Sequence, residues 1–513
     1  MVNTPIPRLE DYSISATTGF LPDIAPLTTL EDLYYAPWET AVSNLQPLLL
    51  SKKIRTVVEK LPVLSTERLK TEPEWRRAYV ILSFLSHSYI WGDKTPSETL
   101  PPSLSVPYLA VSAKLEVPPV ASYAAVCLWN FRPIFTEDPF DCLDNLATLH
   151  TFTGALDESW FYLVSVAIEG RGAAILPLMI SALRNARDDK LDHVISQLQL
   201  FAERLGELSS LLGRMYENCD PHIFYSRIRP YLAGSKNMAE AGLPCGIKYL
   251  DGSGTEVFRQ YSGGSNAQSS LIQAFDIFLG IEHRPTGEKK IERSQEESLS
   301  AQESKTHNFI VVSAIPTPNN QISVFTKLLL KEMRSYMPGP HRRFLEHLSK
   351  ISNIRAYVEQ HSSSGALTVA YDACLHMLRS FRDKHIQIVS RYIILPAKEQ
   401  RIVTGERLGS RQKSATLLSS SGPLLHSHQV QLKGIAQSSK HKSDLRGTGG
   451  TALIPFLKQA RDETGEPSIG AWARRLLTNS RIAPAGRDAE SIKIQGLAGQ
   501  WLDSEDVGGI CHW

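Results

Sequence analysis

One long amphipathic segment, residues 371–397, constrains the fold of this chain more than any other part of its sequence. Read at helical spacing, the segment carries a continuous apolar stripe centred on His385. The stripe is formed by Leu378, Phe381, Ile388, Val389 and Tyr392. The pattern predicts a core helix with one imidazole in its apolar wall.

The imidazole of His385 has two readings. A buried ring must satisfy its nitrogens, because an unpaired buried polar group costs ~1 to 3 kcal/mol. The simpler reading is a core histidine hydrogen-bonded within the protein, and the other is an axial haem ligand. Arg382, one turn earlier, favours the haem. A haem is an apolar plate with an acidic edge, and an arginine can pair bidentately with a propionate.

Composition limits the class of protein. A chain of 513 residues can hold two or more domains, and its formal charge of +2 indicates no polyanionic partner such as a nucleic acid. Six cysteines without a CxxC pair indicate reduced thiols, and the N-terminus lacks a secretory signal, so we expect a cytoplasmic protein. The longest apolar stretch, 160–183, is broken by charge at Glu169 and Arg171, which predicts a core helix and no membrane span.

The chain reads as all-α, with two helical domains. Residues 1–110 predict a small helical domain, 111–480 a large one, and 481–513 a variable tail. Within the large domain, 286–325 reads as an inserted loop, because its first half is charged and rich in serine, and an incorrectly predicted gene model is the alternative. Residues 399–444 read as a mobile loop, because they are polar and have little periodicity. The prolines that begin at Pro101 predict an extended crossing between the domains.

Two polar residues in apolar surroundings leave their roles open. Ser165 lies in an apolar helix, where a serine usually bonds to the carbonyl four residues earlier. Arg229 lies among aromatic residues, where it either extends over apolar surface to reach water or anchors a substrate carboxylate.

Several motifs in a fixed order resemble the indoleamine 2,3-dioxygenase family. Besides the helix around His385, the matching stretches are SHSYIWG (86–92), WFYLVSVAIE (160–169), FYSRIRPYLAG (224–234), SGGSNAQSSLIQAFDIFLGI (262–281), MRSYMPGPHRRFL (333–345) and GTGGT (447–451). The resemblance covers roughly residues 10–290 and 330–475.

The resemblance implies a set of site residues. His385 would ligate the iron of haem b, with Arg382, Gly264 and Ser265 beside the cofactor and Ser165 as the distal catalytic residue. The substrate-binding residues would be Tyr123, Phe161, Phe224, Arg229, Ser265 and Thr448. Two departures from vertebrate members, Tyr225 and Asn266, could narrow or polarise the pocket.

The implied activity is a haem-dependent dioxygenase that uses O2 to open the indole ring of L-tryptophan, giving N-formylkynurenine. This reaction is the first step of the kynurenine route to NAD, and the resemblance also suggests a monomer. The alternatives are a haem protein of the same fold that binds oxygen without turnover, and a scaffold without function if the insertion disrupts folding. The combination of Ser165, Phe224 and Arg229 favours the enzyme, because an oxygen carrier needs no carboxylate anchor.

Overall fold

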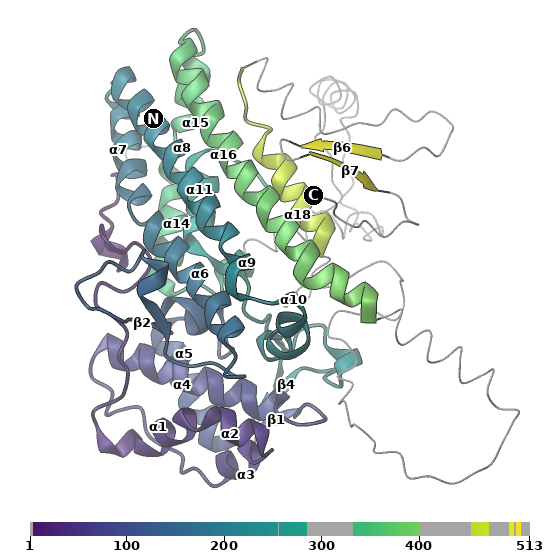
Figure 1. Cartoon of the computed structure of the whole chain (residues 1–513). Coiled ribbons are helices and arrows are strands. Elements are labelled where there is room, and N and C mark those ends of the chain that lie inside the picture. The colour runs from purple at the N-terminus through teal and green to yellow at the C-terminus, as the bar shows by residue number, and fades with distance from the viewer. Residues whose placement is uncertain are drawn as a thin grey trace, which may run out of the picture.

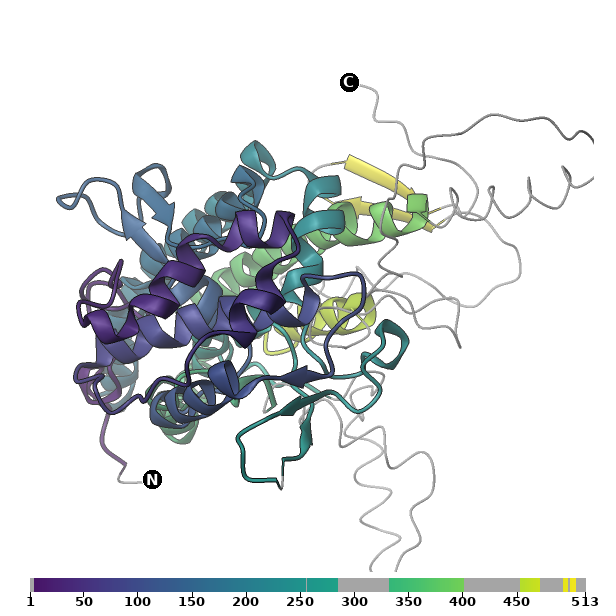
Figure 2. The same ribbon diagram turned by 90° about the horizontal axis from the view of Figure 1, so that it is seen from below.

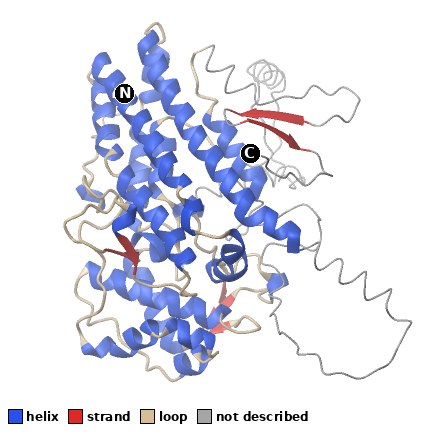
Figure 3. Ribbon diagram, in the orientation of Figure 1, coloured by secondary structure: helices blue, strands red, loops and turns tan. Residues whose placement is uncertain are grey.

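The chain folds into an assembly of helices with only short strands (Figure 3). The computed structural model describes residues 4–254, 256–284, 332–400 and 453–470, together with the backbone of 492–496 and 499–503. The all-α prediction is confirmed. Residues 286–325, nearly all of 399–444 and the loop that contains Thr448 lie outside the described residues.

The centre of the molecule is the pair α8 (Leu191–Gly213) and α16 (Gly365–Val389), which pack along each other (Figure 1). The helix α16 contains the amphipathic segment, and Ser364 caps its N-terminus by accepting a hydrogen bond from the Leu367 N–H. The surrounding helices are α6 (Leu156–Gly172), α7 (Ile175–Arg187), α11 (Ser270–Phe278), α14 (Gly339–Ile351), α15 (Ile354–Gln360) and α18 (Leu453–Thr464).

The N-terminal helices lie across one end of this assembly, and Figure 2 looks onto them. They are α1 (Ala36–Ser43), α2 (Leu45–Leu50), α3 (Ile54–Glu59), α4 (Glu72–Trp91) and α5 (Pro102–Leu115). A capping box between Thr71 and Glu74 starts α4, whose second half is buried on all sides.

The predicted extended crossing at Pro101 is wrong, because residues 102–115 form α5. Pro102 occupies the first turn, where a backbone N–H would have no acceptor within the helix, so its absence costs no hydrogen bond. Pro107 lies inside the helix and removes one hydrogen bond. Burial of Leu104, Tyr108 and Val111 stabilises the helix in spite of that loss.

The motif at residues 86–92 ties the N-terminal helices to the rest of the chain. The His87 ring bonds to the Tyr231 carbonyl at 2.8 Å and to the Ala121 N–H at 2.9 Å, and the Trp91 indole N–H donates to the Ala233 carbonyl. One continuous apolar core runs through both parts. The boundary near residue 110 stays a prediction.

Strands and short helical turns complete the fold. A three-stranded sheet has the order β1 (Thr99–Leu100), β4 (Ile247–Tyr249), β5 (Phe258–Arg259), with β1 parallel and β5 antiparallel to β4. Two antiparallel hairpins pair β2 (Phe131–Pro133) with β3 (Leu146–Thr148) and β6 (Ile492–Gly496) with β7 (Gly499–Asp503). The short elements are η1 (Glu10–Tyr12), η2 (Leu33–Tyr35), η3 (Ala124–Leu128), η4 (Leu143–Asn145), α9 (Met215–Asn218), α10 (Pro221–Ile223), η5 (Phe224–Ile228), η6 (Arg229–Leu232), η7 (Ala239–Ala241), η8 (Asn266–Gln268) and η9 (Ser390–Ile394).

The apolar stretch 160–183 lies within α6 and α7, as expected of a core helix pair. Residues Leu156–Arg187 are long and apolar enough to cross a membrane, but 78% of their most apolar window is buried inside the protein. This burial confirms the prediction of core helices, because the protein interior already covers their apolar surface.

Candidate functional site

A largely apolar cavity of ≈ 260 Å³ lies between α6, α11, α16 and α18. Sequence reasoning selected ten positions around a haem and its substrate, and nine of them line this cavity. These are Tyr123, Phe161, Ser165, Phe224, Arg229, Gly264, Ser265, Arg382 and His385. The tenth, Thr448, lies outside the described residues.

Aromatic rings from three segments form one wall of the cavity. The rings of Phe161 on α6 and Phe224 on η5 lie 4.6 Å apart, and Tyr392 on η9 meets Phe224 edge-on at 5.8 Å. Rings of this kind offer a planar apolar ligand the offset or edge contacts that aromatic groups prefer. An indole has the shape and polarity to fit such a wall.

Arg229 brings a cation to the same cavity. Pro230 follows it in the first turn of η6, as expected, and only 2% of the arginine is exposed. The reading of a side chain that reaches over the surface to water is therefore wrong. Burial lowers the pKa of its guanidinium, which lies 5.6 Å from the Tyr225 ring. A buried guanidinium at a cavity wall is suited to bind a carboxylate.

The small-residue loop 262–265 approaches neighbouring backbone closely. A Cβ on Gly263 would collide with the Leu232 carbonyl, so only glycine fits there. Gln268 fixes the loop, because its side chain donates to the Gly263 carbonyl and accepts from the Tyr123 N–H. The Ser265 hydroxyl accepts from the Ala267 N–H, which leaves its own proton to donate.

His385 has the environment that metal ligation requires. Its ring lines the cavity and makes no hydrogen bond with any described residue, so the reading of a core histidine hydrogen-bonded by these neighbours is not supported. Burial, and then the charge of Arg382, lower the pKa of the imidazole to about 4. A neutral ring with an available lone pair can bind iron, so the residues fit a haem.

Arg382 lines the cavity but is already engaged with protein groups. One guanidinium nitrogen donates to both Asp276 carboxylate oxygens at 2.6 and 2.7 Å, and another bonds to the hydroxyl of Thr464 on α18. The predicted contact with a propionate therefore has to form beside an existing ion pair.

Ser165 and Cys127 both line the cavity, and among the described residues the Ser165 hydroxyl makes no hydrogen bond to the carbonyl four residues earlier. Of the two departures, Asn266 lines the cavity with an exposed side chain, whereas Tyr225 is buried outside the lining. The expected effect of Tyr225 on the pocket is therefore indirect.

Sequence reasoning missed Glu169, a buried carboxyl one turn after Ser165 on α6. One of its oxygens accepts from the Tyr123 hydroxyl at 3.0 Å and from the Ser269 hydroxyl at 2.6 Å. The other oxygen has no partner among the described residues. Burial raises the pKa of Glu169 to about 7, although the two hydrogen bonds oppose the rise. Its i+4 spacing from Ser165 was the available signal.

The fold and the cavity define a helical protein with an aromatic-walled pocket that contains an imidazole and a buried guanidinium. The family model of indoleamine 2,3-dioxygenase matches residues 8–467. The chain is 41% identical over 470 residues to an indoleamine 2,3-dioxygenase of Saccharomyces cerevisiae, covering 90% of this chain and 93% of that protein. It is 39% identical to indoleamine 2,3-dioxygenase nanC of Aspergillus nanangensis, covering 89% and 96%.

A third relative, 6-hydroxytryptophan 2,3-dioxygenase fscD of Fusarium equiseti, is 34% identical over 90% of this chain and 97% of its own length. The chain therefore belongs to the indoleamine 2,3-dioxygenase family, and it is an oxidoreductase of the dioxygenase type. This assignment confirms the resemblance drawn from the sequence motifs.

Proposed function

We propose that the cavity binds haem b through His385 and converts L-tryptophan and O2 to N-formylkynurenine. The observation that carries this proposal is the presence in one aromatic-walled cavity of a buried guanidinium and a neutral imidazole that bonds to no described residue. The haem, when bound, supplies oxygen activation for cleavage of the indole C2–C3 bond.

The protein's own residues then bind and orient the substrate. Arg229 takes the substrate carboxylate, and Phe161 and Phe224 contact the indole ring. Ser165 and Tyr123 border the reacting side, and Ser265 and Arg382 contact the cofactor edge. The apolar lining excludes water, which strengthens the Arg229–carboxylate contact. Thr448 belongs to the segment that we propose closes over the substrate.

Family membership and the buried Arg229 favour turnover over oxygen carriage. The 6-hydroxytryptophan enzyme among the relatives indicates that a substituted indole is a second substrate to assay. Five described cysteines are free thiols, which supports a reducing compartment, and we propose a cytoplasmic monomer that feeds NAD synthesis.

Replacement of His385 tests the cofactor assignment. We expect His385→Ala to lose bound haem or its characteristic absorption spectrum, because the iron loses its axial ligand. His376→Ala is the matched control, because His376 is an exposed histidine on the same helix. A normal haem spectrum in His385→Ala would remove the residue from the ligand position.

Aerobic turnover tests the reaction. Reduced, haem-loaded protein should form N-formylkynurenine from L-tryptophan in proportion to its haem content. Haem and oxygen binding without product would instead establish the oxygen-binding alternative.

A further inference from the structure

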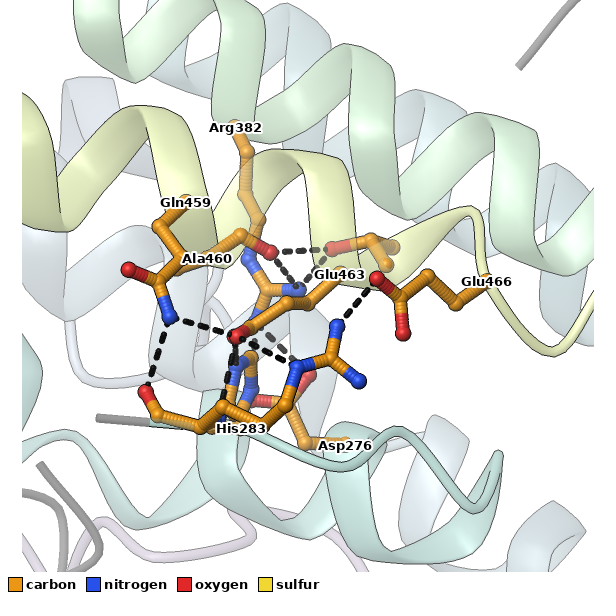
Figure 4. Close-up of polar contacts among 9 residues, drawn as sticks. Asp276, His283, Arg382, Gln459, Ala460, Glu463 and Glu466 are labelled. Atoms are coloured by element: carbon orange, nitrogen blue, oxygen red, sulfur yellow. Dashed lines mark hydrogen bonds and ion pairs between the residues drawn. The ribbon is translucent and has the colours of Figure 1, made fainter. Parts of the chain in front are cut away.

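A buried cluster of charged side chains joins α11, α16 and α18 at the cavity, and Asp276, His283 and Arg382 of this cluster line it (Figure 4). His283 lies at its centre, in the segment that follows α11. One ring nitrogen contacts the Asp276 carboxylate at 3.0 Å, and the other contacts the Glu463 carboxylate at 2.8 Å. The side chains of all three residues are less than one-tenth exposed.

The hydrogen bonds around His283 specify its charge. Asp276 accepts from Arg382 with both oxygens, and Glu463 accepts from the Arg284 N–H and the Gln459 amide. Carboxylates that receive this many donors are stabilised in the ionised form, which can only accept. Both ring nitrogens of His283 must then donate, and only the imidazolium has two N–H groups.

Charge balance within the cluster leads to the same conclusion. The carboxylates of Asp276, Glu463 and Glu466 face the guanidinium groups of Arg382 and Arg284. The two groups that contact the His283 ring are both carboxylates, so the positively charged imidazolium is the favoured form. Burial alone would lower the pKa of His283, but the charges of Asp276 and hydrogen bonds to both carboxylates outweigh it and raise this pKa.

The cluster fixes one wall of the cavity. Phe456, Leu457 and Ala460 of α18 line the cavity, and Glu463 lies one turn after them on the same helix. On the other side, Asp276 holds the guanidinium of Arg382, three residues before His385. His283 therefore links the α18 wall to the arginine at the proposed cofactor edge.

We propose that His283 is a positioning residue, whose imidazolium fastens α18 over the cavity and offsets the charge of Asp276 so that Arg382 can also attract a cofactor carboxylate. The inference rests on the proposed function, because it assumes a haem with propionates at Arg382. A neutral His283 would no longer offset the charge of Asp276, and it would set a ring lone pair against a carboxylate.

The test is the rate at which purified holoenzyme loses haem to excess apomyoglobin, measured from pH 6 to pH 9. The variants are His283→Gln, Glu463→Gln and the double variant. His361→Gln is the matched control, because His361 pairs with Asp189 at 3.1 Å outside the cavity lining. Tryptophan KM and kcat are measured on the same samples.

We expect haem loss from wild type to accelerate towards the alkaline end of this range, because the raised pKa of His283 keeps its proton in place at the acidic end. His283→Gln should lose haem at least tenfold faster than wild type at pH 6.5 and show no such pH dependence. The double variant should lose haem no faster than the faster of the two single variants, because the two residues act as one unit. The His361→Gln protein should lose haem at the wild-type rate at each pH.

Wild-type rates and pH dependence in His283→Gln would overturn the inference while leaving the dioxygenase assignment intact. A wild-type protein that binds no haem would instead refute the proposed function. If His283→Gln does not fold, Glu463→Gln carries the test alone: a faster, less pH-dependent loss supports the inference, and an unchanged profile overturns it.

Discussion

Replacing Glu169 with glutamine should remove a pH-dependent cost of folding. The pKa of this carboxyl rises from 4.5 to about 7 on burial, so the folded protein favours the protonated form. A group whose pKa is raised by folding stabilises the protein below its unfolded pKa and loses that contribution as pH rises through the folded value. The affected range therefore runs from pH 4.5 to about 7.

The size of the effect follows from the two pKa values. One unit of pKa corresponds to ~1.36 kcal/mol, so ionising Glu169 lowers the free energy of unfolding by about 3 kcal/mol across this range. A glutamine keeps the acceptor for Tyr123 and Ser269 but cannot ionise. Its amide nitrogen replaces the oxygen that has no described partner, and that change should add an offset that is the same at every pH.

The assay compares urea unfolding of wild type and Glu169→Gln between pH 5 and pH 8, at equal haem content. The difference in unfolding free energy should move by about 2 to 3 kcal/mol in favour of the variant as pH rises. The infrared absorption of protonated carboxyl groups at pH 6 should be stronger in wild type than in the variant.

Glu158→Gln is a matched control, because Glu158 is a second buried glutamate on α6. Its two oxygens accept from the N–H groups of Phe152 and Thr153 and from the hydroxyls of Thr153 and Tyr162. An amide would set its own N–H groups against those donors, so this variant should be destabilised, most clearly at pH 8. Burial raises the pKa of Glu158 as well, but its four hydrogen bonds oppose the rise. A pH-independent difference for Glu169→Gln would refute the reasoning about its ionisation.

Three further substitutions test the site. Arg229→Ala should raise the KM for L-tryptophan by ~30-fold or more, since loss of a buried charged contact costs ~2 to 5 kcal/mol. A KM within threefold of wild type in steady-state assays would show that Arg229 does not bind the substrate. Gly263→Ala should lower the melting temperature by several degrees, because the added Cβ meets the rigid Leu232 carbonyl and overpacking costs ~1 to 3 kcal/mol. An unchanged melting temperature in calorimetry would contradict this. Asn266→Ala should change the KM for L-tryptophan less than threefold, because the exposed amide stays solvated; a larger change would place that amide on the substrate.

Periodicity was sufficient to predict the elements that bury one regular face. The helix around His385 and the core helices in 160–183 were predicted from their apolar residues, and they correspond to α16 and to α6 with α7. The failure at α5 has a physical cause. Proline content indicates lost hydrogen bonds, but it does not show how much apolar surface a helix buries in the tertiary fold.

The candidate site was predictable to the extent that it consists of local motifs. Eight of the nine predicted residues that line the cavity belong to the quoted motifs, and each motif lies on one helix or loop whose local geometry the sequence already indicates. The cluster around His283 had no local signal. His283 and Glu463 are separated by 180 residues along the chain, and each alone resembles an ordinary surface residue. Only the packing of α18 against α11 and α16 brings them together.

The helix α11 connects the two polar networks behind the cavity. Its N-cap residue, Ser269, donates to Glu169, one turn from Ser165 on α6. Its Asp276 accepts from Arg382, three residues before His385 on α16. The helices that present Ser165 and His385 to the cavity are therefore each tied, one turn away, to the same nine-residue helix. Because buried hydrogen-bonded groups resist displacement, a shift of α11 should be transmitted to both Ser165 and His385. Substitutions at Ser269 and Asp276 should consequently affect substrate binding and cofactor retention together.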